Sequence, residues 1–366
     1  LLVLLVLINR QEIPLYLAGR GETGPDPYRQ RPSSGSTEGR WRRGDAATCA
    51  LLFLLCFAVF FRSPVHQILD SKYISVVSHS LVATGSLAVP ANFVPAQRAE
   101  KSYTLRRVGD RTYHFFSSAP AVLNVPFVAG FGMAGISPVT PEGDFLGHHE
   151  LRILRFSAAV VAAGLCVILF LMSRVWLPPG RSLAVTLVFA FGTQIFSSVS
   201  RPFWSHGWAI LLLAAALLLL VSPRWNDKHW TYALISTLLC WAYFCRPSLS
   251  LAIIGVTLLV LFTRRRFLGP FLVTGLVWAV AFGLHSRMTF GSWLPPYFLS
   301  SHLESGRLAG GLLFSSYPKG VIGTLISPGR GLFLYVPLFA LILVAVARRW
   351  KWIPDKALAV TALGVC

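Results

Sequence analysis

The chain has 366 residues, of which 54% are hydrophobic and only 13% charged, and 33 Lys and Arg against 14 Asp and Glu give a formal net charge of +19. Soluble globular domains carry about a quarter charged residues, and disordered chains are poor in hydrophobic ones, so the composition excludes both classes. After residue 150 there are 19 basic and three acidic residues, spread between long uncharged runs rather than along one stripe. This pattern indicates an all-α integral membrane protein, and we expect no nucleic-acid partner.

Residues 1–45 differ from the rest. Leu1–Ile8 is apolar without an initiating Met or a basic flank, and residues 9–45 are polar and rich in Gly, Pro, Ser and Arg. This composition predicts a disordered segment, either a signal-peptide remnant or non-native sequence, and we exclude it from the predicted fold.

Eight uncharged runs follow, each close to the ~20 residues that a helix needs to cross about 30 Å of hydrocarbon. They predict a first transmembrane helix at 46–62, helices two to seven within 151–286, and helix eight within 331–366. A ninth helix begins at Ala357 and is cut at Cys366, so we expect a fragment. The runs are Ala46–Phe61, Phe156–Ser173, Ser182–Ser200, Pro202–Pro223, His229–Cys245, Pro247–Thr263, Phe267–Ser286 and Gly331–Ala347.

The segment Ala119–Gly135 decides the topology, because it is apolar enough to cross but is interrupted by Pro, Asn and Gly residues. If it does not cross, the basic N-terminal flank and four basic loops all face the cytoplasm, as the positive-inside rule requires. Residues 63–150 then form one long outer loop, with juxtamembrane helices near 66–85 and 119–136, and residues 287–330 form a second outer loop. The four loops carry Arg174 and Arg181, Arg224 and Lys228, Arg264–Arg266, and Arg348, Arg349 and Lys351.

Asp70 is the first candidate for chemistry, because acidic residues are scarce and this one follows the first span at the outer surface. A carboxylate held there can act as general base on an acceptor hydroxyl. It can equally cap the helix predicted near 66–85, and spacing alone favours the cap.

A second acidic group lies in PEGDFLGHHE. His and carboxylate side chains are the usual metal ligands, but this cluster lacks the i, i+4 spacing that places two His on one helix face. We therefore expect a solvated loop, with no metal or other cofactor. The cluster consists of Glu142, Asp144, His148, His149 and Glu150.

Several cations stand at the outer ends of the predicted spans. Each can simply reach the lipid headgroups, and together they can bind a phosphate at the membrane surface, because Arg offers bidentate donors to phosphate. They are Arg155, Arg201, His206, Arg246, Arg287 and Arg330.

Ordered landmarks over residues 46–347 resemble the GT-C-fold membrane glycosyltransferases, specifically bacterial relatives of the dolichyl-phosphate-mannose protein mannosyltransferases. The segment Val199–Trp208 departs from that pattern, since it lacks the acidic residue that many relatives carry in the second outer loop. The landmarks are Asp70-Ser71-Lys72-Tyr73 with Thr84-Gly85, Ser117–Pro126, Arg155–Ala158, Phe191–Ile195 with Phe203–His206, Arg246-Pro247 and Ser327–Pro337.

The resemblance implies a GT-C-like bundle of eight or nine spans in the bacterial plasma membrane. It also implies inverting transfer of a sugar, on the outer face, from a polyprenyl-phosphate donor to a hydroxyl or amine of a lipid, glycan or protein acceptor. Asp70 would be the general base, and no metal is implied. The residues expected to bind substrate or the lipid phosphate are Lys72, Tyr73, Arg155, His206, Arg246 and Arg330.

Three alternatives remain at this stage. A transporter or flippase for a lipid-linked or anionic substrate would use the same body, but it would need charged residues near mid-span, where these runs have almost none. An inactive copy of the enzyme and an assembly subunit without chemistry would also share this sequence pattern.

Overall fold

The computed structural model describes residues 43–63, 71–94, 104–200, 203–293, 322–323, 325–327, 333 and 337–350. Two predicted site residues, Asp70 and Arg330, lie outside these ranges. The described part is mostly helical, and three of its helices are long and apolar enough to cross a membrane: Gly44–Arg62, Gly147–Ser173 and Arg265–Phe290. This agrees with the predicted all-α membrane protein.

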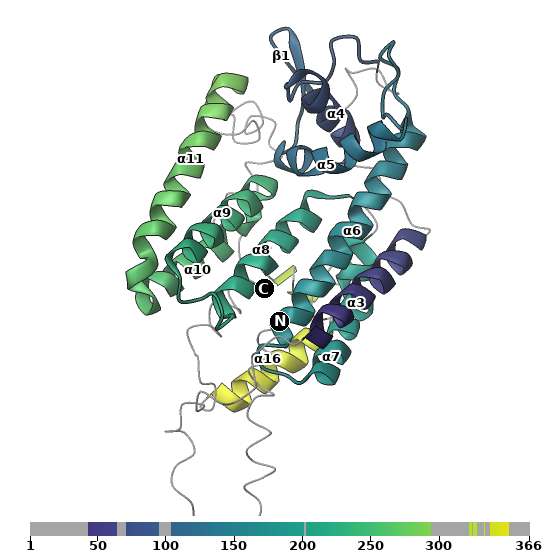
Figure 1. The fold of residues 1–366 in the computed structure, drawn as a ribbon. Coiled ribbons are helices and arrows are strands. Elements are labelled where there is room, and N and C mark those ends of the chain that lie inside the picture. Colours follow the sequence, from purple (N-terminus) through teal and green to yellow (C-terminus); the bar gives the residue numbers. More distant parts are fainter. Residues whose placement is uncertain are drawn as a thin grey trace, which may run out of the picture.

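Eight helices overlap the eight predicted runs, and Figure 1 shows several of them side by side. Five are shorter than the three long ones. They are α3 (Arg43–Arg62), α6 (Gly147–Ser173), α7 (Pro179–Gly192), α8 (Ser205–Val221), α9 (His229–Cys245), α10 (Ser250–Thr263), α11 (Leu268–Phe290) and α16 (Pro337–Arg349). Short helical turns η3 (Pro247–Leu249) and η4 (Arg265–Phe267) precede α10 and α11.

The predicted run Ser182–Ser200 is not one helix. Helix α7 ends at Gly192, and Thr193 is extended with φ −129° and ψ −176°. A π-helical turn, η2 (Ile195–Val199), follows. The predicted run is therefore interrupted, because a single extended residue breaks the helical hydrogen bonds of an apolar sequence.

Helix α6 is the centre of the bundle. Of its apolar window 67% is buried, against 22% for α3 and 17% for α11, which lie at the edges. It packs against α3, α7 and α8. Small residues in α6 let neighbouring backbones approach closely. The fully or almost fully buried ones are Ala158, Ala159, Ala162 and Ala163.

An ion pair joins α3 and α6 at the end of the bundle opposite the long loop that follows α3. Arg174, just after α6, donates from Nε to Oδ1 of Asp45 at 3.0 Å, and both side chains are under 10% exposed. Asp45 lies in the first turn of α3. The predicted boundary at residue 45 is therefore wrong, since the fold already includes this carboxylate.

The long loop after α3 forms a small domain at one end of the bundle (Figure 1). It contains α4 (Ile74–Thr84), α5 (Ala119–Met133) and an antiparallel hairpin of β1 (Leu105–Val108) and β2 (Arg111–His114). Gly109, with φ 60°, opens the two-residue turn. The sequence analysis did not predict this hairpin. We call residues 71–94 and 104–146 the outer domain.

Helix α4, which overlaps the juxtamembrane helix predicted near 66–85, is packed into the outer domain. It begins at Ile74, and its first five residues are all buried. Helices α5 and α6 and strand β2 pack around it, so several of its faces are covered by protein. Part of the range predicted for this helix, residues 66–70, lies outside the described residues.

Helix α5 corresponds to the segment that decides the topology. It has 15 residues, about 22 Å at 1.5 Å per residue, so its length alone does not distinguish it from the bundle helices α7 and α10, which have 14 residues each. In Figure 1 it lies across the bundle end, and it contacts α6, α8 and α9. This geometry suits a helix lying along the membrane surface.

Candidate functional site at the outer end of the bundle

The turn before α4 contains two of the residues that the resemblance assigns to substrate binding. Tyr73 adopts the left-handed conformation, with φ 71° and ψ 3°. Its side chain is 0% exposed, and the ring centroid lies 5.4 Å from that of Phe93 and 4.9 Å from that of Phe145. The prediction that Tyr73 contacts substrate is inconsistent with this burial, because the ring belongs to the core of the outer domain.

Lys72 is half-buried beside that core. Its Nζ lies 5.1 Å from the centroid of the Tyr73 ring and 5.9 Å from that of Phe145, so the ammonium packs against aromatic faces. The carbonyl oxygen of Lys72 accepts a hydrogen bond from His114 Nε2 at 3.2 Å. The hairpin therefore fixes the backbone at Lys72.

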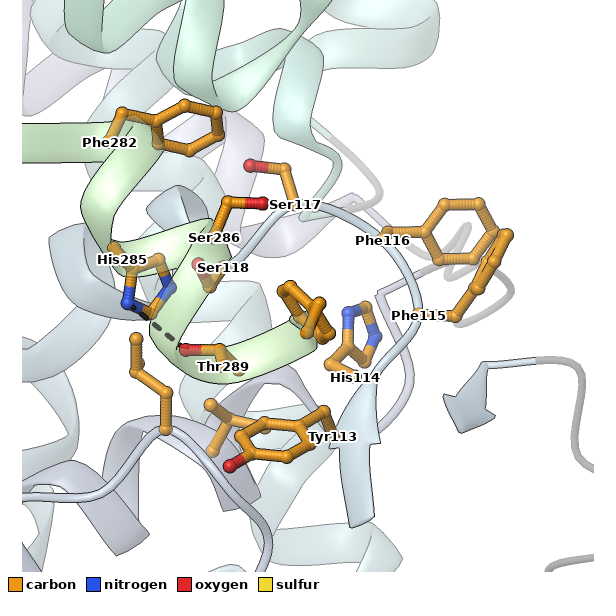
Figure 2. Close-up of a pocket in the computed structure, with 13 residues that line it drawn as sticks. Tyr113, His114, Phe115, Phe116, Ser117, Ser118, Phe282, His285, Ser286 and Thr289 are labelled. Atoms are coloured by element: carbon orange, nitrogen blue, oxygen red, sulfur yellow. Dashed lines mark hydrogen bonds between the residues drawn. The ribbon is translucent and has the colours of Figure 1, made fainter. Parts of the chain in front are cut away.

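A pocket lies between the outer domain and the outer end of α11 (Figure 2). Its wall combines aromatic rings with imidazole and hydroxyl groups, and His285 and Thr289 of α11 are 3.4 Å apart between Nδ1 and Oγ1. In Figure 2 the hydroxyls of Ser117 and Ser286 lie near each other. The lining residues are Val77, Leu87, Tyr113, His114, Phe115, Phe116, Ser117, Ser118, Phe282, His285, Ser286, Thr289 and Phe290.

Two hydrogen bonds connect the pocket wall to neighbouring segments, and one of them reaches a predicted site residue. His114, in the wall, binds the Lys72 carbonyl. Ser117, also in the wall, donates to the carbonyl oxygen of Phe244, two residues before Arg246. The pocket wall thus spans from the turn that follows Asp70 in sequence to the outer end of α9.

Arg155 has a different environment. Its Nε donates to the carbonyl oxygen of Phe61, and its guanidinium carbon lies 4.9 Å from the centroid of the Phe61 ring. The side chain therefore links the outer ends of α6 and α3. Arg155 does not line the pocket of Figure 2.

The other two predicted residues within the described ranges are Arg246 and His206. Arg246 ends α9, where its N–H donates to the carbonyl of Ala242. The ring of His206 lies 5.3 Å from that of Trp204, at the start of α8. Both lie at the same end of the bundle as the outer domain, but neither lines the pocket. The hypothesis that these cations together bind a phosphate expects them to lie around one cavity. The described cations do not.

The acidic segment PEGDFLGHHE was expected to be solvated, and for Glu150 that expectation is wrong. Glu142, Asp144 and His148 are exposed, but Glu150 is 0% exposed in the first turn of α6. Its Oε1 accepts a hydrogen bond from the N–H of Ser75 at 3.3 Å. Within the described ranges, no group of three or more His, Cys, Asp or Glu residues is arranged to hold a metal ion.

Sequence reasoning missed His114, His285 and Ser286. For the last two a signal existed, because these polar residues end a long apolar run. His114 had no such signal, since its position follows from the hairpin. No protein-family model, no curated protein and no solved structure matches this chain.

Proposed function

We propose that the chain is a GT-C-like membrane glycosyltransferase with eight or nine spans in the bacterial plasma membrane. It transfers a sugar from a polyprenyl-phosphate donor to a hydroxyl or amine of a lipid, glycan or protein acceptor at the outer face. The observation that carries the proposal is the position of the pocket. It lies where the outer domain meets the helix ends, and His114 connects it to the turn that directly follows Asp70 in sequence.

The proposed step is an inverting displacement. The acceptor oxygen or nitrogen attacks the anomeric carbon on the face opposite the phosphate, and a new bond forms as the carbon–oxygen bond to phosphate breaks. The Asp70 carboxylate takes the acceptor proton, and polyprenyl phosphate leaves with the bonding electron pair. Charge then builds on the phosphate, and cations at the membrane surface stabilise it.

The structure suggests how the proposed roles are divided. Lys72 is the described cation closest in sequence to Asp70, and its backbone is fixed by the pocket wall. Arg246 and His206, which lie at the same end of the bundle, are the next candidates to bind the lipid phosphate. The resemblance adds Arg330 as a further candidate. Arg155 holds α3 against α6 in addition to any contact with the phosphate. For Tyr73 we propose a role in the core only.

The charge distribution favours an enzyme over a transporter. In the described helices, Asp, Glu, Lys and Arg residues lie near one end of a helix and none lies in the middle. Transport sites for charged substrates need polar or charged groups near the membrane midplane.

The test is sugar transfer by purified protein in reconstituted membranes, with a radiolabelled polyprenyl-phosphate sugar as donor. Asp70→Asn keeps the side-chain shape and removes the base, so we expect transfer to fall at least about 100-fold, the contribution typical of general-base catalysis. Asp144→Asn is the matched control, because Asp144 is an exposed carboxylate of the same outer domain. Equal activity of both variants and wild type would refute the assignment of Asp70.

A further inference from the structure

Helix α4 begins without a cap of its own. The N-cap position is occupied by Tyr73, whose side chain makes no capping hydrogen bond. The first N–H groups of a helix have no partner within the helix, and buried ones need a partner from elsewhere. Because the first five residues of α4 are buried, water does not supply it.

The partner comes from a different helix. Glu150 in the first turn of α6 accepts the N–H of Ser75 at 3.3 Å, and the N–H of Tyr73 also faces its carboxylate. A carboxylate at this position also faces the positive end of the helix dipole. Helix α6 therefore caps α4 across 75 residues of sequence.

The cap is held in a polar layer beneath α4. On one side, Glu150 in the first turn of α6 accepts the N–H of Ser75. On the other side, Asn124 donates from Nδ2 to the hydroxyl of Ser75 at 3.5 Å. Both Glu150 and Asn124 are 0% exposed. Residues of α5 and α6 thus converge on the first turn of α4.

One carboxylate oxygen makes this arrangement costly. Oε2 of Glu150 is buried and has no hydrogen-bond partner among the described residues. Burying a polar atom without a partner is unfavourable, and an apolar side chain would avoid that cost. The position of the carboxylate therefore calls for a role beyond filling the core.

We propose that Glu150 is a positioning residue for the transfer reaction. By capping α4 it fixes the turn Ser71–Tyr73, and His114 fixes the same turn from the pocket side through the Lys72 carbonyl. The backbone of Lys72 is thereby kept at one place beside the pocket wall, and its ammonium lies against the rings of Tyr73 and Phe145. The inference rests on the proposed function, because it assigns Lys72 to the site of transfer.

The experiment combines kinetics with amide hydrogen exchange on the full chain in detergent. Glu150→Ala removes the cap, so we expect exchange at the Tyr73 and Ser75 amides to rise about tenfold, the size of a lost cap. We expect kcat to fall at least about tenfold, with the KM for donor changed less than about threefold, because a misplaced group acts on the transition state. Glu150→Gln keeps an acceptor oxygen and should restore most of both quantities. Glu142→Ala, in the exposed part of the same segment, should change neither.

Unchanged exchange in both Glu150 variants would overturn the cap. Faster exchange with unchanged kcat would overturn the positioning role but not the cap. If wild-type protein transfers no sugar, the positioning role falls together with the proposed function, and the exchange rates still decide the cap. If Glu150→Ala does not fold, Glu150→Met, which fills the volume without an acceptor oxygen, supplies both measurements, and wild-type exchange and kcat in that variant would overturn the proposal.

Discussion

The ion pair between Asp45 and Arg174 gives the most direct prediction about the fold. Asp45→Asn keeps the size of the side chain and removes its charge. The Arg174 guanidinium, in a side chain only 9% exposed, then loses its charged partner. It keeps its hydrogen bond to the carbonyl oxygen of Leu177, so part of its polar environment remains.

The expected loss is large for a single substitution. Removing one partner of a buried ion pair costs about 3–5 kcal/mol, because the remaining charge is uncompensated. Since Arg174 retains the Leu177 carbonyl, we expect a loss of about 3 kcal/mol, the lower end of that range. The matched control is the exposed pair of Asp227 and Arg266, with side chains 65% and 62% exposed. Asp227→Asn should cost less than about 1 kcal/mol.

The assay is the free energy of unfolding of each variant in detergent, from denaturant titration followed by a local probe near α3. A double-mutant cycle with Arg174→Gln isolates the pair from the effect of each substitution alone. Equal, small losses for Asp45→Asn and Asp227→Asn would refute the reasoning. Residue 45 would then lie outside the fold, as its polar sequence context suggested.

Two further predictions concern the outer domain. Gly143→Ala should destabilise it by more than about 3 kcal/mol, because φ is +101° there and a Cβ would overlap a backbone carbonyl oxygen. Gly109→Ala is the control and should cost about 1–2 kcal/mol, because φ is +60° there and the space around it is open. Thermal unfolding compares the two variants, and equal midpoints would contradict the prediction. Burial lowers the pKa of His79, so the unfolded state binds the proton more readily and stability should fall as pH drops through about 6.5. Over this pH range the free energy of unfolding of His79→Gln should fall less than that of the wild type. An identical pH dependence of the two proteins would contradict the prediction.

The helices of the bundle could be located from sequence because a long apolar run in a membrane has few alternatives to a helix. Helix α3 begins three residues before the predicted run, and α6 begins nine residues before it. The break at Thr193 could not be foreseen, since one extended residue leaves no mark in an apolar run. The hairpin was missed because strands of four residues are too short to show a clear alternation.

The site was harder to predict because its contacts are distant in sequence. Glu150 stands in a segment whose composition suggests a solvated loop, and only the packing of α6 against α4 shows that it is buried. Tyr73 fits a helical pattern in sequence, yet it lies before the helix in the left-handed conformation. His114 forms a hydrogen bond with the carbonyl of Lys72, which is 42 residues away in sequence, and local sequence patterns do not reveal such contacts.

The most direct test of the central claim is the fate of the donor. Purified wild-type protein in liposomes is given a polyprenyl-phosphate sugar and an acceptor, and both the released lipid phosphate and the anomeric configuration of the product are measured. The account predicts one polyprenyl phosphate released per sugar transferred, with the product configuration opposite to that of the donor. Donor that crosses the membrane intact, or a product with retained configuration, would contradict it.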